Sequence, residues 1–172
     1  MKRSIAFVLF FVVLFSCKEE QQKPETMLVP SANETADMNK AWNQEEQELI
    51  HQFIARKGWD MIETESGLNY LVYKNGTGAQ AKPGMKAMVD YSISLLDGTE
   101  LYTTQSSGPR PFQIDKDNVE QGLHEGITYL RVGDRAKMII PYYLAHGLMG
   151  DHEKIPPLAS LVFDIRLLGL SD

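Results

Sequence analysis

The sequence predicts an α+β fold, in which a mostly antiparallel sheet is crossed by one short helix and preceded by a longer one. Several short segments alternate apolar and polar residues, which is the period of a β-strand, whereas residues 117–133 repeat apolar residues at helical spacing. A chain of 172 residues with 43% hydrophobic residues is large enough for one domain with a real core. We expect this domain over residues 61–172.

The start of the chain is typical of a secretory signal. A basic pair precedes an unbroken apolar run over residues 5–15, which is short for a membrane span. Cys17 is the single cysteine, so it forms no internal disulfide, and "LFSC" resembles the bacterial lipobox, where lipid is attached to the cysteine after cleavage. We therefore interpret residues 1–16 as a lipoprotein signal peptide and Cys17 as a lipidation site, with a free thiol as the alternative. Lys18 after the cysteine resembles lipoproteins sorted to the outer membrane, which predicts a lipid-anchored protein on the periplasmic side of a bacterial envelope.

Between the signal and the domain, the sequence predicts a tether and a helix. Residues 17–37 are polar, carry two prolines and lack a sustained period, which indicates a flexible tether. Residues 38–60 have helical spacing; Asp37 or Asn39 suits the start and Gly58 the end. This helix either packs on the following domain or pairs with a second copy to form a homodimer. Its apolar residues are Trp42, Leu49, Ile50, Phe53 and Ile54.

The domain itself alternates strand signals with one helix. "GLNYLVYKNGTG" predicts a strand and an Asn-Gly turn, and "KAMVDYSISLLDGTELY" predicts a hairpin that turns at Asp97-Gly98. "RAKMIIP" and "SLVFDIRLLGL" predict two further strands. Before them, "DNVEQGLHEGITYLRVGD" predicts a helix capped by Asp117 or Asn118 and ended by Gly133, with His124 facing solvent. The apolar face of this helix consists of Val119, Leu123, Ile127 and Leu130.

The stretch from residue 62 to residue 170 resembles the FKBP-type peptidyl-prolyl cis-trans isomerases. The matching pieces are "ETESGLNYLVYKNGTG", "VDYSISLLDGTEL", "RPFQI", "VEQGLHEGITYLRVGDRAKMIIP", "LAHG" and "IPPLASLVFDIRLL", in family order and at nearly family spacing. The resemblance implies a strongly curved antiparallel sheet wrapped around a short helix, with an apolar pocket for a proline ring and no cofactor. With the lipobox and the N-terminal helix, the chain also resembles the gliding-motility-associated isomerase lipoproteins of Bacteroidetes.

The same resemblance implies the residues of the site. In the family, the backbone N–H at the position of Glu120 donates to the substrate carbonyl. His146 stands where the tyrosine of an "AYG" motif is frequent, Tyr102 where an aspartate is common, and Leu123 where a tryptophan often forms the floor. The resemblance implies catalytic roles for Tyr91, Glu120 and His146, and substrate-binding roles for Leu101, Tyr102, Phe112, Val119, Leu123, Ile155 and Phe163.

Two alternatives compete with an isomerase. One is a module of an envelope complex that binds proline-containing segments, or holds unfolded chains as a chaperone, with weak or no turnover. It is suggested by Tyr102, Leu123 and His146, which depart from the family pattern. The other is a metal site, although two histidines six residues apart in a glycine-containing loop do not match the spacing of zinc sites. That site would consist of His146, Asp151, His152 and Glu153. We instead expect no metal and interpret "LAHGLMGDHEKIPP" as a flap over the pocket, with Asp151, His152 and Glu153 at its solvated tip. A net charge of −6 argues against nucleic-acid binding.

Overall fold

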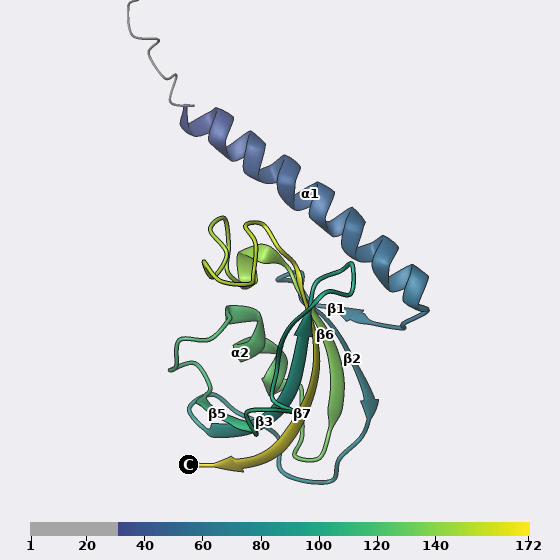
Figure 1. The fold of residues 1–172 in the computed structure, drawn as a ribbon, viewed down its shortest axis with the longest axis vertical. Helices are drawn as coiled ribbons and strands as arrows, with labels where there is room; N and C mark the ends of the chain where they lie inside the picture. Colours follow the sequence, from purple (N-terminus) through teal and green to yellow (C-terminus); the bar gives the residue numbers. More distant parts are fainter. Residues whose placement is uncertain (1–30) are drawn as a thin grey trace, which may run out of the picture.

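Two helices and seven strands make up the part of the chain that the computed structural model describes, residues 31–172 (Figure 1). The expected signal peptide, Cys17 and the tether before residue 31 lie outside these residues. The elements in chain order are α1 (Ala32–Lys57), β1 (Ile62–Glu63), β2 (Asn69–Lys74), β3 (Lys86–Ser94), β4 (Glu100–Thr103), β5 (Arg110–Gln113), α2 (Gln121–Thr128), β6 (Arg135–Ile140), the 3₁₀ turn η1 (Tyr142–Leu144) and β7 (Leu161–Ser171).

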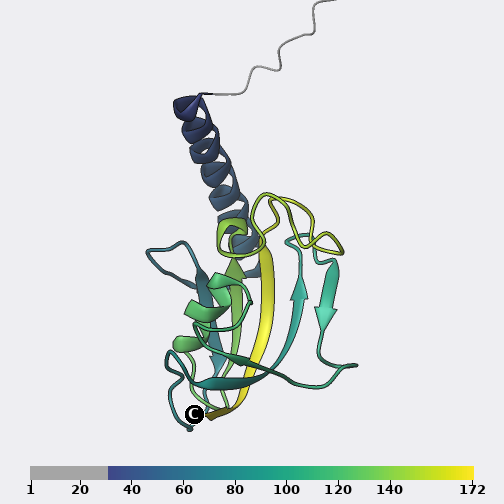
Figure 2. The same cartoon turned by 90° about the vertical axis from the view of Figure 1, so that its left-hand side faces the viewer.

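The sheet is antiparallel throughout and strongly curved. Its order is β1-β2-β6-β7-β3-β4, and β5 pairs with the first half of β3. Figures 1 and 2 show α2 lying across one face of the sheet, with the strands bending around it. This arrangement confirms the predicted α+β class, with the curved sheet, the short crossing helix and the N-terminal helix. β3 pairs with β7, β4 and β5, so it joins both short strands to the rest of the sheet.

α2 lies close to β6 because two glycines face that strand. A Cβ atom at Gly122 would lie 2.4 Å from the side chain of Ile140, and one at Gly126 would lie 2.6 Å from Met138. The helix is shorter than predicted. Neither Asp117 nor Asn118 caps it, since Glu120 is the residue before the first turn, and it ends at Thr128 instead of continuing to Gly133. The carboxylate of Asp117 instead accepts the backbone N–H of Gln113 at 2.8 Å.

α1 begins six residues earlier than the predicted start at residue 38. Ser31 and Glu34 form a capping box, in which the side chain of each accepts the backbone N–H of the other. Residues 32–37, expected in the tether, therefore form the first turns of the helix. The predicted end is confirmed, because Gly58 adopts the left-handed conformation with φ +65°.

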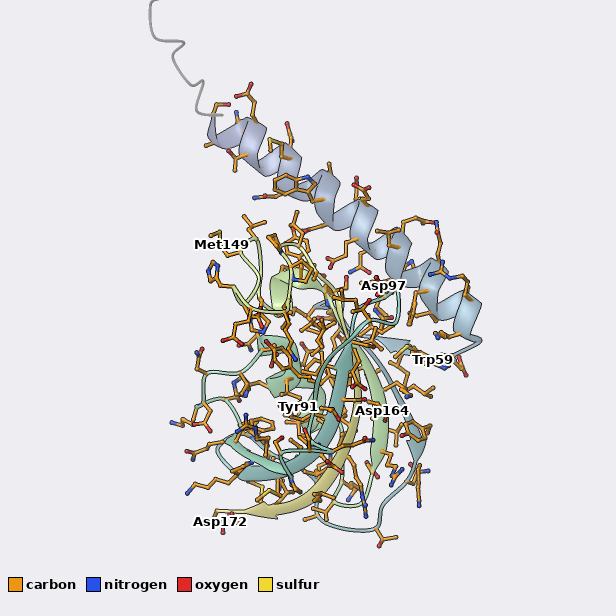
Figure 3. The ribbon with its side chains drawn as sticks, viewed as in Figure 1. Trp59, Tyr91, Asp97, Met149, Asp164 and Asp172 are labelled. Carbon is orange, nitrogen blue, oxygen red and sulfur yellow. The ribbon has the colours of Figure 1, made fainter. Side chains whose placement is uncertain are left out.

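The second half of α1 packs on the domain. Ile50 and Phe53 form a small apolar cluster with Ile139 of β6 and Val162 of β7. Their neighbours Met138 and Phe163 belong to the main core, so α1 covers the face of the sheet opposite to α2. Trp59, labelled in Figure 3, meets the ring of Phe53 edge-on at 5.6 Å. Packing on the domain, one of the two predicted alternatives, is confirmed, while pairing with a second copy stays a prediction.

None of the helices within residues 31–172 combines the length and the apolar character that a membrane span requires.

Candidate active site

A cavity of about 380 Å³ opens between the concave face of the sheet and the N-terminal end of α2. Apolar and aromatic side chains dominate its walls, with one arginine and one glutamate among them. The lining residues are Val89, Tyr91, Ile93, Arg110, Pro111, Phe112, Val119, Glu120, Leu123 and Phe163. A pre-formed concave site of this size, mostly apolar and with few polar groups, is typical of small-ligand pockets.

The sheet supplies the aromatic walls. Phe163 of β7 is fully buried and lies opposite Ile93 of β3 in the strand register. The rings of Tyr91 and Phe163 have their centroids 6.0 Å apart and are tilted by 51°. Phe112 comes from β5, the strand that pairs with the start of β3, and is also buried. These rings are rigidly held because each belongs to a paired strand of the core.

The start of α2 supplies the floor and the polar group. Leu123 lies in the first turn and is 3% exposed, and Val119 and Glu120 immediately precede the helix. The backbone N–H of Glu120 donates to no acceptor within residues 31–172. An apolar cavity that contains a free N–H offers one donor to a bound carbonyl and few competing polar contacts.

Comparison with known proteins identifies the family. A model of the FKBP-type peptidyl-prolyl cis-trans isomerase family matches residues 77–168. This chain belongs to that family. It is 31% identical to the macrophage infectivity potentiator of Trypanosoma cruzi over 170 aligned residues. These residues are 98% of this chain and 83% of that protein.

Bacterial FKBP-type isomerases show the same likeness. The chain is 37% identical over 136 residues to the FKBP-type peptidyl-prolyl cis-trans isomerase FkpA of Aeromonas hydrophila, covering 78% of this chain and 49% of that protein. The chain thus spans about half the length of this relative. The crystal structure of FkpA from Escherichia coli superposes with a TM-score of 0.66 at 29% identity, covering 80% of this chain and 64% of that one. The predicted family is confirmed.

The FKBP-type cavity brings together six of the ten residues predicted for the site. These are Tyr91, Phe112, Val119, Glu120, Leu123 and Phe163. Leu101, Tyr102, His146 and Ile155 do not line it. Leu101 and Ile155 are buried in the adjoining core, at 6% and 4% exposure. Sequence reasoning missed Arg110 and Pro111, and also Val89 and Ile93, although the last two share the alternating apolar face of Tyr91.

Tyr102 and Asp151 hold the tip of the flap. The Asp151 carboxylate accepts the hydroxyl of Tyr102 and the backbone N–H groups of Glu153, Lys154 and Ile155, at 2.9, 2.9 and 2.7 Å for the three N–H groups. Burial alone would raise the pKa of Asp151, but these hydrogen bonds outweigh it and lower the pKa to about 2. Asp151 was expected at a solvated tip together with His152 and Glu153. It is instead half-buried and organises the turn, while the other two residues are exposed.

His146 joins the flap to the rim of the cavity. Its Nε2 lies 3.2 Å from Oε1 of Glu120, and the two side chains are 33% and 12% exposed. His146 was predicted to contact a substrate carbonyl in place of a tyrosine. The structure instead places its ring against the side chain of Glu120, the residue whose backbone N–H is free to donate.

His124 was predicted to face solvent, and this prediction is wrong. The residue is 5% exposed, and its Nδ1 accepts the backbone N–H of Asp115 at 2.9 Å. Nε2 therefore carries the hydrogen and donates to the carbonyl of Asp117 at 3.0 Å. His124 thus ties the segment between β5 and α2 to the helix, which fixes the position of Val119 and Glu120 in the cavity.

Among residues 31–172, no group of three or more His, Cys, Asp or Glu side chains is placed to hold a metal ion. The alternative of a metal site in the flap therefore gains no support.

Proposed function

We propose that this FKBP-type chain catalyses the cis-trans isomerisation of X-Pro bonds in polypeptides. The observation that carries the proposal is the apolar cavity lined by a residue with a free backbone donor, the N–H of Glu120. Aromatic walls from Tyr91, Phe112 and Phe163 suit a proline ring. We infer that this N–H donates to the carbonyl of a bound peptide, as the resemblance to the family implies.

No nucleophile or cofactor is required for this chemistry. Rotation about a peptide bond faces a barrier of about 18–20 kcal/mol, because the amide resonance must be broken. A carbonyl solvated by water favours the planar amide, whereas a dry cavity that fits the twisted imide favours the transition state. Each reduction of about 1.36 kcal/mol in the barrier increases the rate tenfold. Apolar walls and one oriented donor are therefore sufficient for a useful acceleration.

A peptide-exchange measurement tests the activity. The purified protein is added to a peptide of the Ala-Leu-Pro-Phe type, and the rate of cis-trans exchange is followed at rising protein concentration. The uncatalysed reaction takes roughly 10–100 s at 25 °C, so an acceleration is readily observed. Exchange that stays at the uncatalysed rate at every protein concentration would rule out the isomerase.

The signal, lipobox and tether support a place in the cell envelope. We infer that Cys17 carries lipid, that the domain faces the periplasm from the outer membrane, and that its clients are exported envelope proteins. A link to gliding motility rests on the resemblance to the Bacteroidetes lipoproteins. A Cys17→Ala variant should leave the membrane fraction and appear in the soluble periplasmic fraction. Membrane association equal to that of the parent would contradict the lipid anchor.

α1 also supports a homodimer. Residues 32–41 are exposed on every side and extend beyond the domain (Figure 2). A second copy can pair along this half of the helix while the other half stays packed on β6 and β7. Sedimentation analysis should give twice the monomer mass, and a monomer at all concentrations would exclude the pairing.

A proline-binding module without turnover is the second candidate. It is favoured by the contact of His146 with Glu120, which leaves the ring outside the cavity lining. In that case the cavity would bind the same peptide, seen as shifted resonances of Tyr91 and Phe112, while the exchange rate would stay unchanged.

A further inference from the structure

Glu46 of α1 is a buried carboxylate at the point where the helix meets both ends of the flap. The predicted flap, residues 144–157, is the middle of the segment 141–160 that connects β6 to β7, and in the structure this whole segment forms the flap. Oε1 of Glu46 accepts the backbone N–H of Tyr142 at 2.7 Å and the hydroxyl of Ser160 at 2.6 Å. Tyr142 lies at the start of the flap and Ser160 at its end, so one oxygen atom of α1 joins the two ends of the segment.

Two neighbours of Glu46 on the same helical face contact the same end of the flap. Oδ1 of Asn43 accepts the hydroxyl of Tyr142 at 2.6 Å, and Nε2 of Gln47 donates to the hydroxyl of Tyr143 at 3.2 Å. The spacing of i, i+3 and i+4 places all three residues on one side of α1. Ile50, one turn further on, anchors that side in the apolar cluster with β6 and β7. The polar contacts therefore exist only while α1 is packed on the domain.

The flap continues from this base to the rim of the cavity. Asp151 holds its tip to Tyr102 of β4, and His146 lies 3.2 Å from Glu120, a lining residue. Within residues 31–172, the flap is thus held at its base by α1, at its tip by the sheet and in its middle by the cavity rim. Of these three attachments, the one at the base is made by α1, which lies outside the FKBP-type domain.

Burial of the polar Glu46 side chain lowers the stability of the fold, which points to a specific role for its oxygen atoms. The residue is 6% exposed, and its second oxygen, Oε2, is buried without a hydrogen-bond partner within residues 31–172. Burial of an unpartnered polar atom costs free energy, whereas an apolar side chain at this site would fill the space without that cost. Only an acceptor, however, can satisfy the buried N–H of Tyr142 and hold the hydroxyl of Ser160 at the same time.

We propose that Glu46 is a positioning residue that couples the N-terminal helix to the isomerase pocket through the flap. When α1 is docked, Glu46 fixes both ends of the flap, which places His146 against Glu120 and so sets the free N–H at the rim. When α1 leaves the domain, the flap loosens and the pocket binds peptide more weakly. This inference rests on the proposed isomerase function of the pocket.

Three variants test the coupling. Glu46→Ala removes the acceptor, Glu46→Gln keeps an amide oxygen that can accept both donors, and Glu45→Ala changes the exposed neighbour as a matched control. We expect hydrogen exchange of the backbone amides of residues 142–150 to rise at least fivefold in Glu46→Ala. The KM for the peptide should rise about threefold with kcat little changed, because the flap affects binding more than the chemical step. Glu46→Gln and Glu45→Ala should behave like the parent in both measurements.

Two results would overturn the proposal. One is a Glu46→Ala variant whose flap exchange and KM equal those of the parent, and the other is a Glu46→Gln variant as impaired as Glu46→Ala. If Glu46→Ala does not fold, Ser160→Ala, which removes one donor at the far end of the flap, provides the comparison and should raise flap exchange in the same direction. If the parent itself fails to accelerate isomerisation, the proposed function fails, but the exchange measurement still decides whether Glu46 holds the flap.

Discussion

Nε2 of His146 and Oε1 of Glu120 lie 3.2 Å apart, which joins the middle of the flap to the residue just before α2. Glu120 contributes to the cavity through its backbone N–H and to the flap through its side chain. Glu120 therefore links the flap to the cavity. A change to the Glu120 side chain, or to the His146 ring that it contacts, should alter the orientation of the Glu120 backbone N–H.

A double-mutant cycle tests this link. His146→Ala and Glu120→Ala should each lower kcat/KM about two- to fivefold, as expected for a partly exposed pair worth at most about 1 kcal/mol. The double variant should be no worse than either single one, because both substitutions break the same contact. Kinetics on the same proline peptide measures all four proteins, and fully additive losses would show that the two residues act independently.

Tyr91 provides a test of the cavity itself. Its hydroxyl makes no hydrogen bond within the described part of the chain, so Tyr91→Phe should change the free energy of unfolding by no more than about 0.5 kcal/mol. Because we expect the hydroxyl to contact the bound peptide, kcat/KM should fall about two- to tenfold, the value of one hydrogen bond.

Tyr73→Phe is the matched control. The hydroxyl of Tyr73 donates to Asp164 at 2.7 Å, and the residue does not line the cavity. This variant should lose about 1 kcal/mol of stability at most and keep its kcat/KM. Equal losses of activity in the two variants would show that the cavity is not the site.

Local patterns predicted the architecture well. Ala87, Val89 and Ile93 are buried on one face of β3, as their alternation with polar residues indicates, and Asp97-Gly98 makes the predicted turn with φ +93° at the glycine. By contrast, β5 was not predicted as a strand, because four residues are too few for a period and Pro111 is disfavoured away from edge strands.

The long-range polar contacts could not be predicted from local patterns. Tyr102 and Asp151 are 49 residues apart, and nothing local shows that a tyrosine will bind a carboxylate on the flap. His124 looked solvent-facing because histidine is polar, yet two backbone groups satisfy both of its ring nitrogens and allow burial. The start of α1 was misplaced for another reason, since residues 32–37 have no large apolar side chain that would show a helical period, and only the capping box of Ser31 and Glu34 marks the start.

The flap tip should respond to acid in a defined direction. The pKa of Asp151 is lowered from its usual 3.8 to about 2, so the folded state releases this proton more readily than the unfolded state. Its stabilising contribution is therefore complete above about pH 4 and is lost as the pH falls toward 2. Urea unfolding at pH 7, 4 and 3 should show this loss in the parent.

Tyr102→Phe should weaken that dependence, because Tyr102 donates one of the hydrogen bonds that lower the pKa. The same hydrogen bond raises the pKa of Tyr102 to about 12, so the hydroxyl stays protonated and donates at neutral pH. At pH 7 the variant should lose about 1 kcal/mol of stability. An acid profile identical to that of the parent would contradict the role of this contact.

The packing of α1 on the domain can be tested by measuring the free energy of unfolding of variants in this helix. Ile50 is fully buried in the cluster with Ile139 and Val162, so Ile50→Ala should lower the free energy of unfolding by about 2–5 kcal/mol. Leu49→Ala, at a neighbour that is 51% exposed, should change it by about 0.5 kcal/mol at most. Tryptophan fluorescence is a suitable probe because Trp42 and Trp59 lie on and beside α1. Equal effects of the two substitutions would show that the helix does not dock as described.

The most direct test of the central claim combines catalysis with the position of the donor. Cis-trans exchange of the proline peptide is measured by NMR at rising concentrations of the protein, and the backbone amide resonance of Glu120 is followed in the same titration. The account predicts an exchange rate that rises in proportion to protein concentration, together with a saturable shift of the Glu120 amide. An exchange rate that stays uncatalysed, or catalysis that leaves the Glu120 amide unshifted, would contradict it.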